Sequence, residues 1–130
     1  MSSPYTTIVA SKAPAAIGPY VHATKHNGVI YASGSIPLVP ETMKVIEGGI
    51  TEQAGQMFKN VAAVLEASSS SPKSVLKTTV FLKTMDDFAV FNKLYAEFFG
   101  ESKPSRSCVA AAKLPLDVLC EMEFIAVEEK

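Results

Sequence analysis

Apolar residues recur at helical spacing through the middle of the chain. They fall at Ile50, Ala54, Met57, Val61, Val64 and Leu65. Such a stripe is typical of a helix with one face in a core, so we predict a helix over Ile50–Ala67. The segment Ser68–Pro72 ends it, because serine side chains compete for backbone hydrogen bonds and proline cannot continue a helix.

An aromatic stripe predicts a second helix that ends near Phe99. Its members are Phe88, Phe91, Tyr95, Phe98 and Phe99. We expect Asp86 and Asp87 to cap its start, with Thr84 and Asp87 at capping-box spacing. Gly100 is well placed to end it.

Alternating or β-branched segments predict the strands. These segments are Tyr5–Ala10 (a short edge strand), Val21–Lys25, Val29–Ser35, Val75–Lys83, Ser105–Ala112 and Val118–Val127. Asn27-Gly28 tolerates positive φ and predicts a tight hairpin between the second and third strands. Pro- and Gly-rich stretches predict an ordered turn at Ala13–Tyr20 and a polar loop through Pro37, Pro40 and Gly48-Gly49. The last two strands are joined across Leu114-Pro115.

This order of elements predicts a single α+β domain over residues 1–130, with two helices covering one face of a mixed sheet. We assign Val109, Cys120, Met122 and Phe124 to the other face, where apolar positions need cover. We therefore expect part of that face to be buried against another copy of the chain. The alternative is a monomer with one mixed, solvated face.

Composition excludes several classes of protein. Hydrophobic residues make up 48% and charged residues 19%, which is typical of a globular chain, and the formal net charge is -1. That charge argues against nucleic-acid binding as a general function, because it gives no basic field to hold a phosphate backbone. No apolar run is long enough to span a bilayer and the N-terminus does not resemble a targeting signal. Two cysteines are too few for a disulfide framework, so we expect a cytoplasmic protein, although the sequence does not decide against a mitochondrial one.

The sequence contains no motif that is typical of a metal site or a cofactor site. His22 and His26 lie at hairpin spacing with no cysteine or carboxylate beside them, so we interpret them as surface or hairpin residues. Cys108 and Cys120 have no adjacent base and are interpreted as small buried residues. No glycine-rich phosphate loop is present either. We expect neither a metal nor an organic cofactor.

Arg106 is a candidate anion clamp. It is the only arginine, while the other 11 of the 12 basic residues are lysines. A planar guanidinium holds a carboxylate through two parallel hydrogen bonds, which an ammonium cannot do. Composition alone leaves open that Arg106 is an ordinary surface or ion-paired residue.

Glu121 is the second candidate. Glu121 and Glu123 point to the same face of an extended strand, roughly 6–7 Å apart. Two carboxylates on an apolar strand are costly unless one of them meets a cation or serves a function. A glycosidase pair is one reading, but neighbouring positions on one strand seldom converge on a sugar. A structural salt bridge is the serious alternative.

Four stretches resemble the Rid (YjgF/YER057c/UK114) family, and together they cover nearly the whole chain. They are APAAIGPY at Ala13–Tyr20, Ser33-Gly34 with Ile36-Pro37, DFAVFNKLYAEFF at Asp87–Phe99, and SRSCVAAAKLPLDVLCEMEFIAV at Ser105–Val127. The joint presence of Tyr20, Arg106, Cys108 and Glu121 resembles the RidA-type branch of 2-iminobutanoate/2-iminopropanoate deaminases. Ser35 departs from the glutamine frequent in the family at that place, which bears on substrate preference.

The resemblance implies a chorismate-mutase-like fold of the bacillus type, a homotrimer whose sheets form a central barrel, and cofactor-free sites between subunits. It implies that these sites hydrolyse 2-aminoacrylate and related imines to 2-oxo acids and ammonia. Arg106 would hold the substrate carboxylate, and Glu121 with the backbone of Cys108 would position and activate water. Tyr20 and Gly34 would line the pocket.

The sequence leaves two alternatives open, one for a pocket residue and one for the function. Asn92 lies on the apolar stripe, where it is either a pocket residue or a satisfied buried amide. The alternative function is a small-carboxylate-binding or translation-inhibiting, endoribonuclease-like interaction protein.

Overall fold

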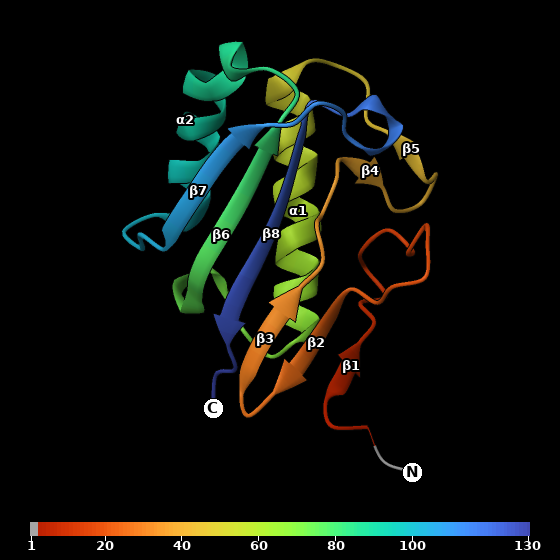
Figure 1. The fold of residues 1–130 in the computed structure, drawn as a ribbon, viewed down its shortest axis with the longest axis vertical. Coiled ribbons are helices and arrows are strands. Elements are labelled where there is room, and N and C mark those ends of the chain that lie inside the picture. The colour runs from red at the N-terminus through yellow and green to blue at the C-terminus, as the bar shows by residue number, and fades with distance from the viewer. Residues whose placement is uncertain (1–2) are drawn as a thin grey trace.

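In the computed structural model, which describes residues 3–130, a six-stranded mixed sheet is covered on one face by two helices (Figure 1). The helices are α1 (Ile50–Ala67) and α2 (Phe88–Phe99). In spatial order the strands are β1 (Thr6–Ile8), β2 (Ala23–His26), β3 (Val29–Ala32), β8 (Cys120–Val127), β6 (Val75–Leu82) and β7 (Ser105–Ala110). Only β6 and β7 pair in parallel. The predicted α+β class, a mixed sheet with two helices on one face, and all six predicted strands are confirmed, with shorter bounds for most strands.

Local sequence explains the connections that were predicted. At the hairpin between β2 and β3, Asn27 and Gly28 adopt φ of 51° and 78°, as a tight turn requires. The polar loop after β3 contains a small two-stranded sheet of β4 (Leu38–Val39) and β5 (Lys44–Val45), which was not predicted. Strands of two residues are too short to show an alternating pattern.

Helix α1 has the bounds predicted for it, but the start of α2 differs from the prediction. A 3₁₀ turn, Met85–Asp87, comes first, and the Thr84 hydroxyl accepts a hydrogen bond from the Asp86 N–H at 3.1 Å. Asp87 makes no capping bond, because its backbone is already helical (φ −88°, ψ 0°) whereas a capping residue is extended. Gly100 ends α2 with φ of 62°, as predicted.

The face assigned to β8 was wrong for three residues. Cys120, Met122 and Phe124 are buried on the helix-covered face. Because side chains alternate along a strand, Glu121 and Glu123 lie on the opposite, open face. The sequence pattern showed the alternation correctly, but it did not show which set of positions faced the helices.

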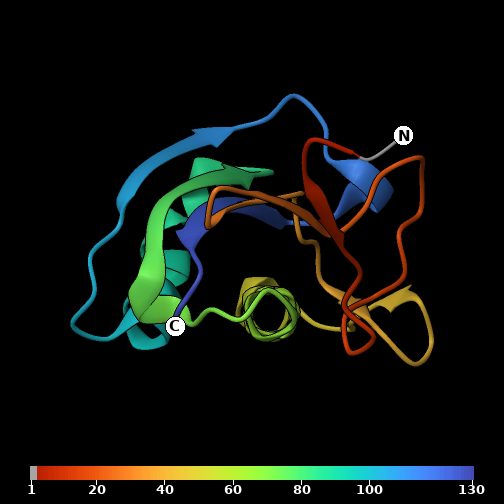
Figure 2. The same cartoon turned by 90° about the horizontal axis from the view of Figure 1, so that it is seen from below.

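The open face of the sheet keeps large apolar side chains in contact with solvent. Val109, which was correctly assigned there, is 49% exposed, and Tyr31 is 46% exposed. Leu76 is also exposed, because an irregularity in the pairing of β6 with β8 between Val75 and Lys77 breaks the alternation. Figure 2 shows the sheet curving over α1, which is seen end-on. Between residues 3 and 130, neither helix is long and apolar enough to cross a membrane.

Candidate active site

Arg106 lies on β7 at the edge of the sheet and points to the helix-covered side. Its Nη1 donates a hydrogen bond to Oδ1 of Asn92 on α2 at 2.7 Å. The guanidinium carbon lies 4.8 Å from the ring centre of Tyr95 and 5.6 Å from that of Phe88. Across residues 3–130 Arg106 makes no ion pair. A guanidinium has five N–H donors, so most of them remain for an anion.

The residues around Arg106 are held in neutral form. Burial raises the pKa of Tyr95, although a hydrogen bond between its hydroxyl and that of Thr78 (2.8 Å) and the charge of Arg106 lower it. Burial also raises the pKa of the Cys108 thiol, and only Arg106 opposes this. A neutral thiol is a poor nucleophile. The geometry therefore favours a role for the backbone of Cys108 over one for its sulfur.

Glu121 lies on the open face of β8 and is packed against Gly34. A side-chain carbon on Gly34 would stand 2.0 Å from Oε2 of Glu121, so only glycine leaves room for this carboxylate. Two backbone hydrogen bonds join the same two segments, from Ser35 N–H to Met122 O (2.8 Å) and from Met122 N–H to Ser35 O (3.1 Å). The Ser33-Gly34-Ser35 stretch thus fixes where the carboxylate lies.

The surroundings of Glu121 suit a proton carrier. Burial raises its pKa above the ordinary 4.5, and the neighbouring charge of Glu123 raises it further. No cation within the described part of the chain forms an ion pair with Glu121. A carboxylate with a raised pKa is a better base near neutral pH than an ordinary glutamate.

The two candidate groups do not meet within one chain. Strand β6 lies between β7 and β8, so Arg106 is two strand spacings, roughly 10 Å, from β8, and the register sets it opposite Phe124 rather than Glu121. The two side chains also point to opposite faces of the sheet. The predicted alternative of a salt bridge between them is therefore not formed in the single chain. Two half-sites result: an arginine half-site of Arg106, Asn92 and Cys108, and a carboxylate half-site of Glu121 and Gly34.

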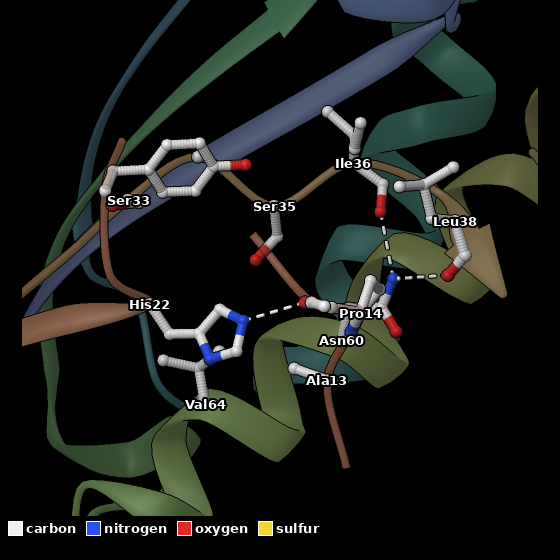
Figure 3. A pocket seen from close by; sticks show the side chains of 12 residues that line it. Ala13, Pro14, His22, Ser33, Ser35, Ile36, Leu38, Asn60 and Val64 are labelled. Atoms are coloured by element: carbon white, nitrogen blue, oxygen red, sulfur yellow. Dashed lines mark hydrogen bonds between the residues drawn. The ribbon is translucent and has the colours of Figure 1, made fainter. Parts of the chain in front are cut away.

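Tyr20 belongs to the carboxylate side. Its hydroxyl accepts a hydrogen bond from the Ile17 N–H at 3.3 Å, and it is 44% exposed. Together with Gly34 it borders a cavity of about 40 Å³ between the Ala13–Tyr20 turn and α1 (Figure 3). Ligand pockets are usually several hundred Å³. This cavity is therefore too small for the imino acid that the family resemblance implies as the substrate.

His22 fixes the turn that carries Tyr20. Its Nδ1 accepts the Ala10 N–H at 2.7 Å, so Nε2 carries the proton and donates to Pro14 O, also at 2.7 Å (Figure 3). Both ring nitrogens are occupied, which agrees with a structural role. His26, interpreted from the sequence as a surface or hairpin residue, is exposed on the hairpin. Over residues 3–130 no cluster of His, Cys, Asp and Glu side chains could hold a metal ion.

Some residues of the site region were missed from the sequence. Tyr95 was assigned only to the core stripe, yet it stacks on Arg106. Gln53, Gln56 and Asn60 are buried polar residues on α1, at positions that the apolar stripe left unassigned. Their spacing of three and four residues was the available signal, since it places them on one helix face.

Comparison with known proteins identifies the class to which this fold and these half-sites belong. Residues 10–128 match the model of the family described as Endoribonuclease L-PSP. The chain belongs to this family, the Rid/YjgF family that the four motifs resembled.

Named relatives agree with this assignment over nearly full length. The 2-iminobutanoate/2-iminopropanoate deaminase of Salmonella typhimurium is 45% identical and aligns over 93% of this chain and 96% of its own. The crystal structure of YEO7 from yeast has a TM-score of 0.94 and 47% identity, covering 96% of this chain and 99% of that one. The structure of E. coli TdcF with bound serine has a TM-score of 0.90 and 39% identity, covering 95% and 98%.

Proposed function

We propose that this protein is a hydrolytic deaminase of small imine and enamine carboxylates such as 2-iminopropanoate, 2-iminobutanoate and 2-aminoacrylate. The observation that carries the proposal is the pair of half-sites: a guanidinium with free donors, and a half-buried carboxylate with a raised pKa. The name of the Salmonella relative and the serine bound to TdcF support the same substrate class.

Arg106 holds the substrate carboxylate through two parallel hydrogen bonds. Asn92 takes one guanidinium N–H, and the Tyr95 ring supports the guanidinium plane, so the remaining donors are oriented before substrate arrives. Pre-orientation lowers the entropy lost on binding. The backbone of Cys108, two residues along the same strand face, lies beside the bound substrate.

Glu121 moves the protons. It takes one from a water molecule as the water oxygen bonds to the imine carbon. The C=N electron pair passes to nitrogen, and Glu121 returns the proton to that nitrogen, so the carbinolamine is neutral and Glu121 is again ionised. Glu121 then accepts the hydroxyl proton of the carbinolamine as the C–N bond breaks. The products are a 2-oxo acid and ammonia, and the carboxylate is regenerated through proton transfer to the leaving nitrogen. Such acid–base help is worth roughly 10²–10⁴-fold.

The complete site requires two copies of the chain. The carboxylate carbon and the imine carbon of the substrate are bonded to each other, whereas Arg106 and Glu121 of one chain lie on opposite faces. We propose that the arginine half-site of one copy meets the carboxylate half-site, with Tyr20 and Gly34, of a neighbour. A homotrimer with the open sheet faces inside a central barrel would cover the exposed Tyr31 and Val109.

Turnover is tested by generating imines with an amino-acid oxidase and following the release of ammonia and 2-oxo acid. We expect both to appear faster when the protein is added. Tight binding of serine or a 2-oxo acid without any acceleration would mean a small-carboxylate-binding protein instead. The family description raises RNA cleavage, but a net charge of -1 gives no general attraction for a phosphate backbone.

We also propose that the protein works in a reducing compartment, the cytoplasm or the mitochondrial matrix. Cys108 and Cys120 are both free thiols in the structure. Cys120 is buried, and burial raises the pKa of its thiol to about 12, so it stays unreactive there.

A further inference from the structure

Three buried amides form a row on α1. Gln53, Gln56 and Asn60 are only 8%, 8% and 2% exposed, and their spacing places them on one face of the helix. Buried polar side chains are costly unless they are hydrogen-bonded. Each of these three makes such a bond, and two of them bind the backbone of segments next to the carboxylate half-site.

Asn60 holds the segment that follows Gly34. Its Nδ2 donates to Ile36 O and to Leu38 O, each at 2.9 Å (Figure 3). Its Oδ1 accepts a hydrogen bond from Nε2 of Gln56 at 3.1 Å, which fixes the orientation of the amide. The carbonyls that Asn60 holds therefore lie two and four residues after Gly34.

Gln53 holds the segment that precedes Glu121. Its Oε1 accepts the Leu119 N–H at 2.8 Å. The two segments are joined to each other by the Ser35–Met122 hydrogen bonds. One rigid helix therefore holds both sides of the contact between Gly34 and Glu121.

We propose that Gln53, Gln56 and Asn60, hereafter the amide row, are positioning residues that set the place of the Glu121 carboxylate against Gly34. Directional hydrogen bonds to backbone atoms fix a segment more closely than apolar packing does, and a small misplacement far from the chemistry costs on the order of 10²-fold in rate. The expected loss of rate rests on the proposed deaminase function, whereas the expected change in the surroundings of Glu121 does not.

The test uses two variants from opposite ends of the row. Asn60→Ser is too short to reach both carbonyls, and Gln53→Met keeps most of the volume but loses the acceptor. The matched control is Val61→Ala, which removes buried volume from the same helix without touching the row. For each protein, the titration of the Glu121 carboxyl is followed by NMR, together with the melting temperature and, in the oxidase-coupled assay, kcat and KM.

We expect both row variants to shift the Glu121 titration down toward 4.5, because a loosened Gly34 segment admits water to the carboxylate. Their kcat should fall on the order of 10²-fold with KM changed less than about threefold. Val61→Ala should lower the melting temperature but leave the titration and kcat alone.

An unchanged titration in either row variant, or an equal shift in Val61→Ala, overturns the proposal and leaves the amides as ordinary core residues. A parent protein that does not hydrolyse imines overturns the proposed function instead. In that case the titration alone still decides whether the row positions Glu121.

Discussion

Gly34→Ala should separate activity from stability. The added methyl carbon would lie 2.0 Å from Oε2 and 2.8 Å from Cδ of Glu121, while side-chain carbons in proteins are essentially never found below 3.0 Å from a neighbour. The carboxylate must therefore move by about 1 Å or more. A displacement of that size costs on the order of 10²-fold in rate. The φ of Gly34 is not positive, so alanine fits the backbone and its lower unfolded-state entropy contributes about 0.4–1 kcal/mol in favour of folding.

We therefore expect kcat to fall on the order of 10²-fold while the melting temperature changes little. The measurements are the oxidase-coupled assay and thermal unfolding. Gly55→Ala on α1 is the matched control, because a carbon added there meets no atom within 4 Å and activity should be kept. Full activity of Gly34→Ala, or a loss of rate that follows a loss of folding, would refute the view that Gly34 makes room for a catalytic carboxylate.

Four further expectations follow from the half-sites. Arg106→Ala should abolish hydrolysis with the fold intact, and Arg106→Lys should restore little activity, since an ammonium lacks the planar pair of donors. Activity of the alanine variant within about threefold of the parent would contradict the role of Arg106 in holding the substrate carboxylate. Glu121→Gln should lower kcat about 10²-fold with KM little changed, and a larger loss in Glu123→Gln, the control on the same strand face, would reverse the assignment. Because the pKa of Glu121 is raised, the acid limb of kcat/KM should lie above pH 4.5 and move lower in Glu123→Gln; a limb at 4.5 or below in the parent counts against Glu121 as the base. Light scattering should give about three times 13.9 kDa, and a monomer mass would remove the shared site.

The elements of this fold were predictable where local chemistry decides them. The apolar stripe of α1 and the serine–proline stop after it gave both helix bounds, and Asn27-Gly28 gave the hairpin. The start of α2 was mispredicted, because the choice between Thr84 and Asp87 as the cap depends on the preceding 3₁₀ turn. Local patterns do not report such turns.

Tertiary relations were less accessible from the sequence. Alternation along β8 grouped Glu121 with Glu123 correctly, but which face the helices cover depends on how α1 and α2 cross the sheet. The contact between Gly34 and Glu121 joins residues far apart in the chain, so no local pattern contains it. Family resemblance supplied these residues together, and the structure added that Arg106 and Glu121 do not meet in one chain.

The half-buried position of Glu121 affects how the stability of the fold depends on pH. Its folded pKa lies above the unfolded value, so the folded chain binds this proton more tightly than the unfolded chain does. Tighter proton binding stabilises the folded chain. This contribution is fully present below pH 4.5 and is lost as the pH rises through the folded pKa. Above the folded pKa the molecule therefore carries an ionised, half-buried group that favours unfolding. Selection for heat resistance alone would replace this carboxylate with a neutral side chain, and only a requirement for its chemistry would keep it.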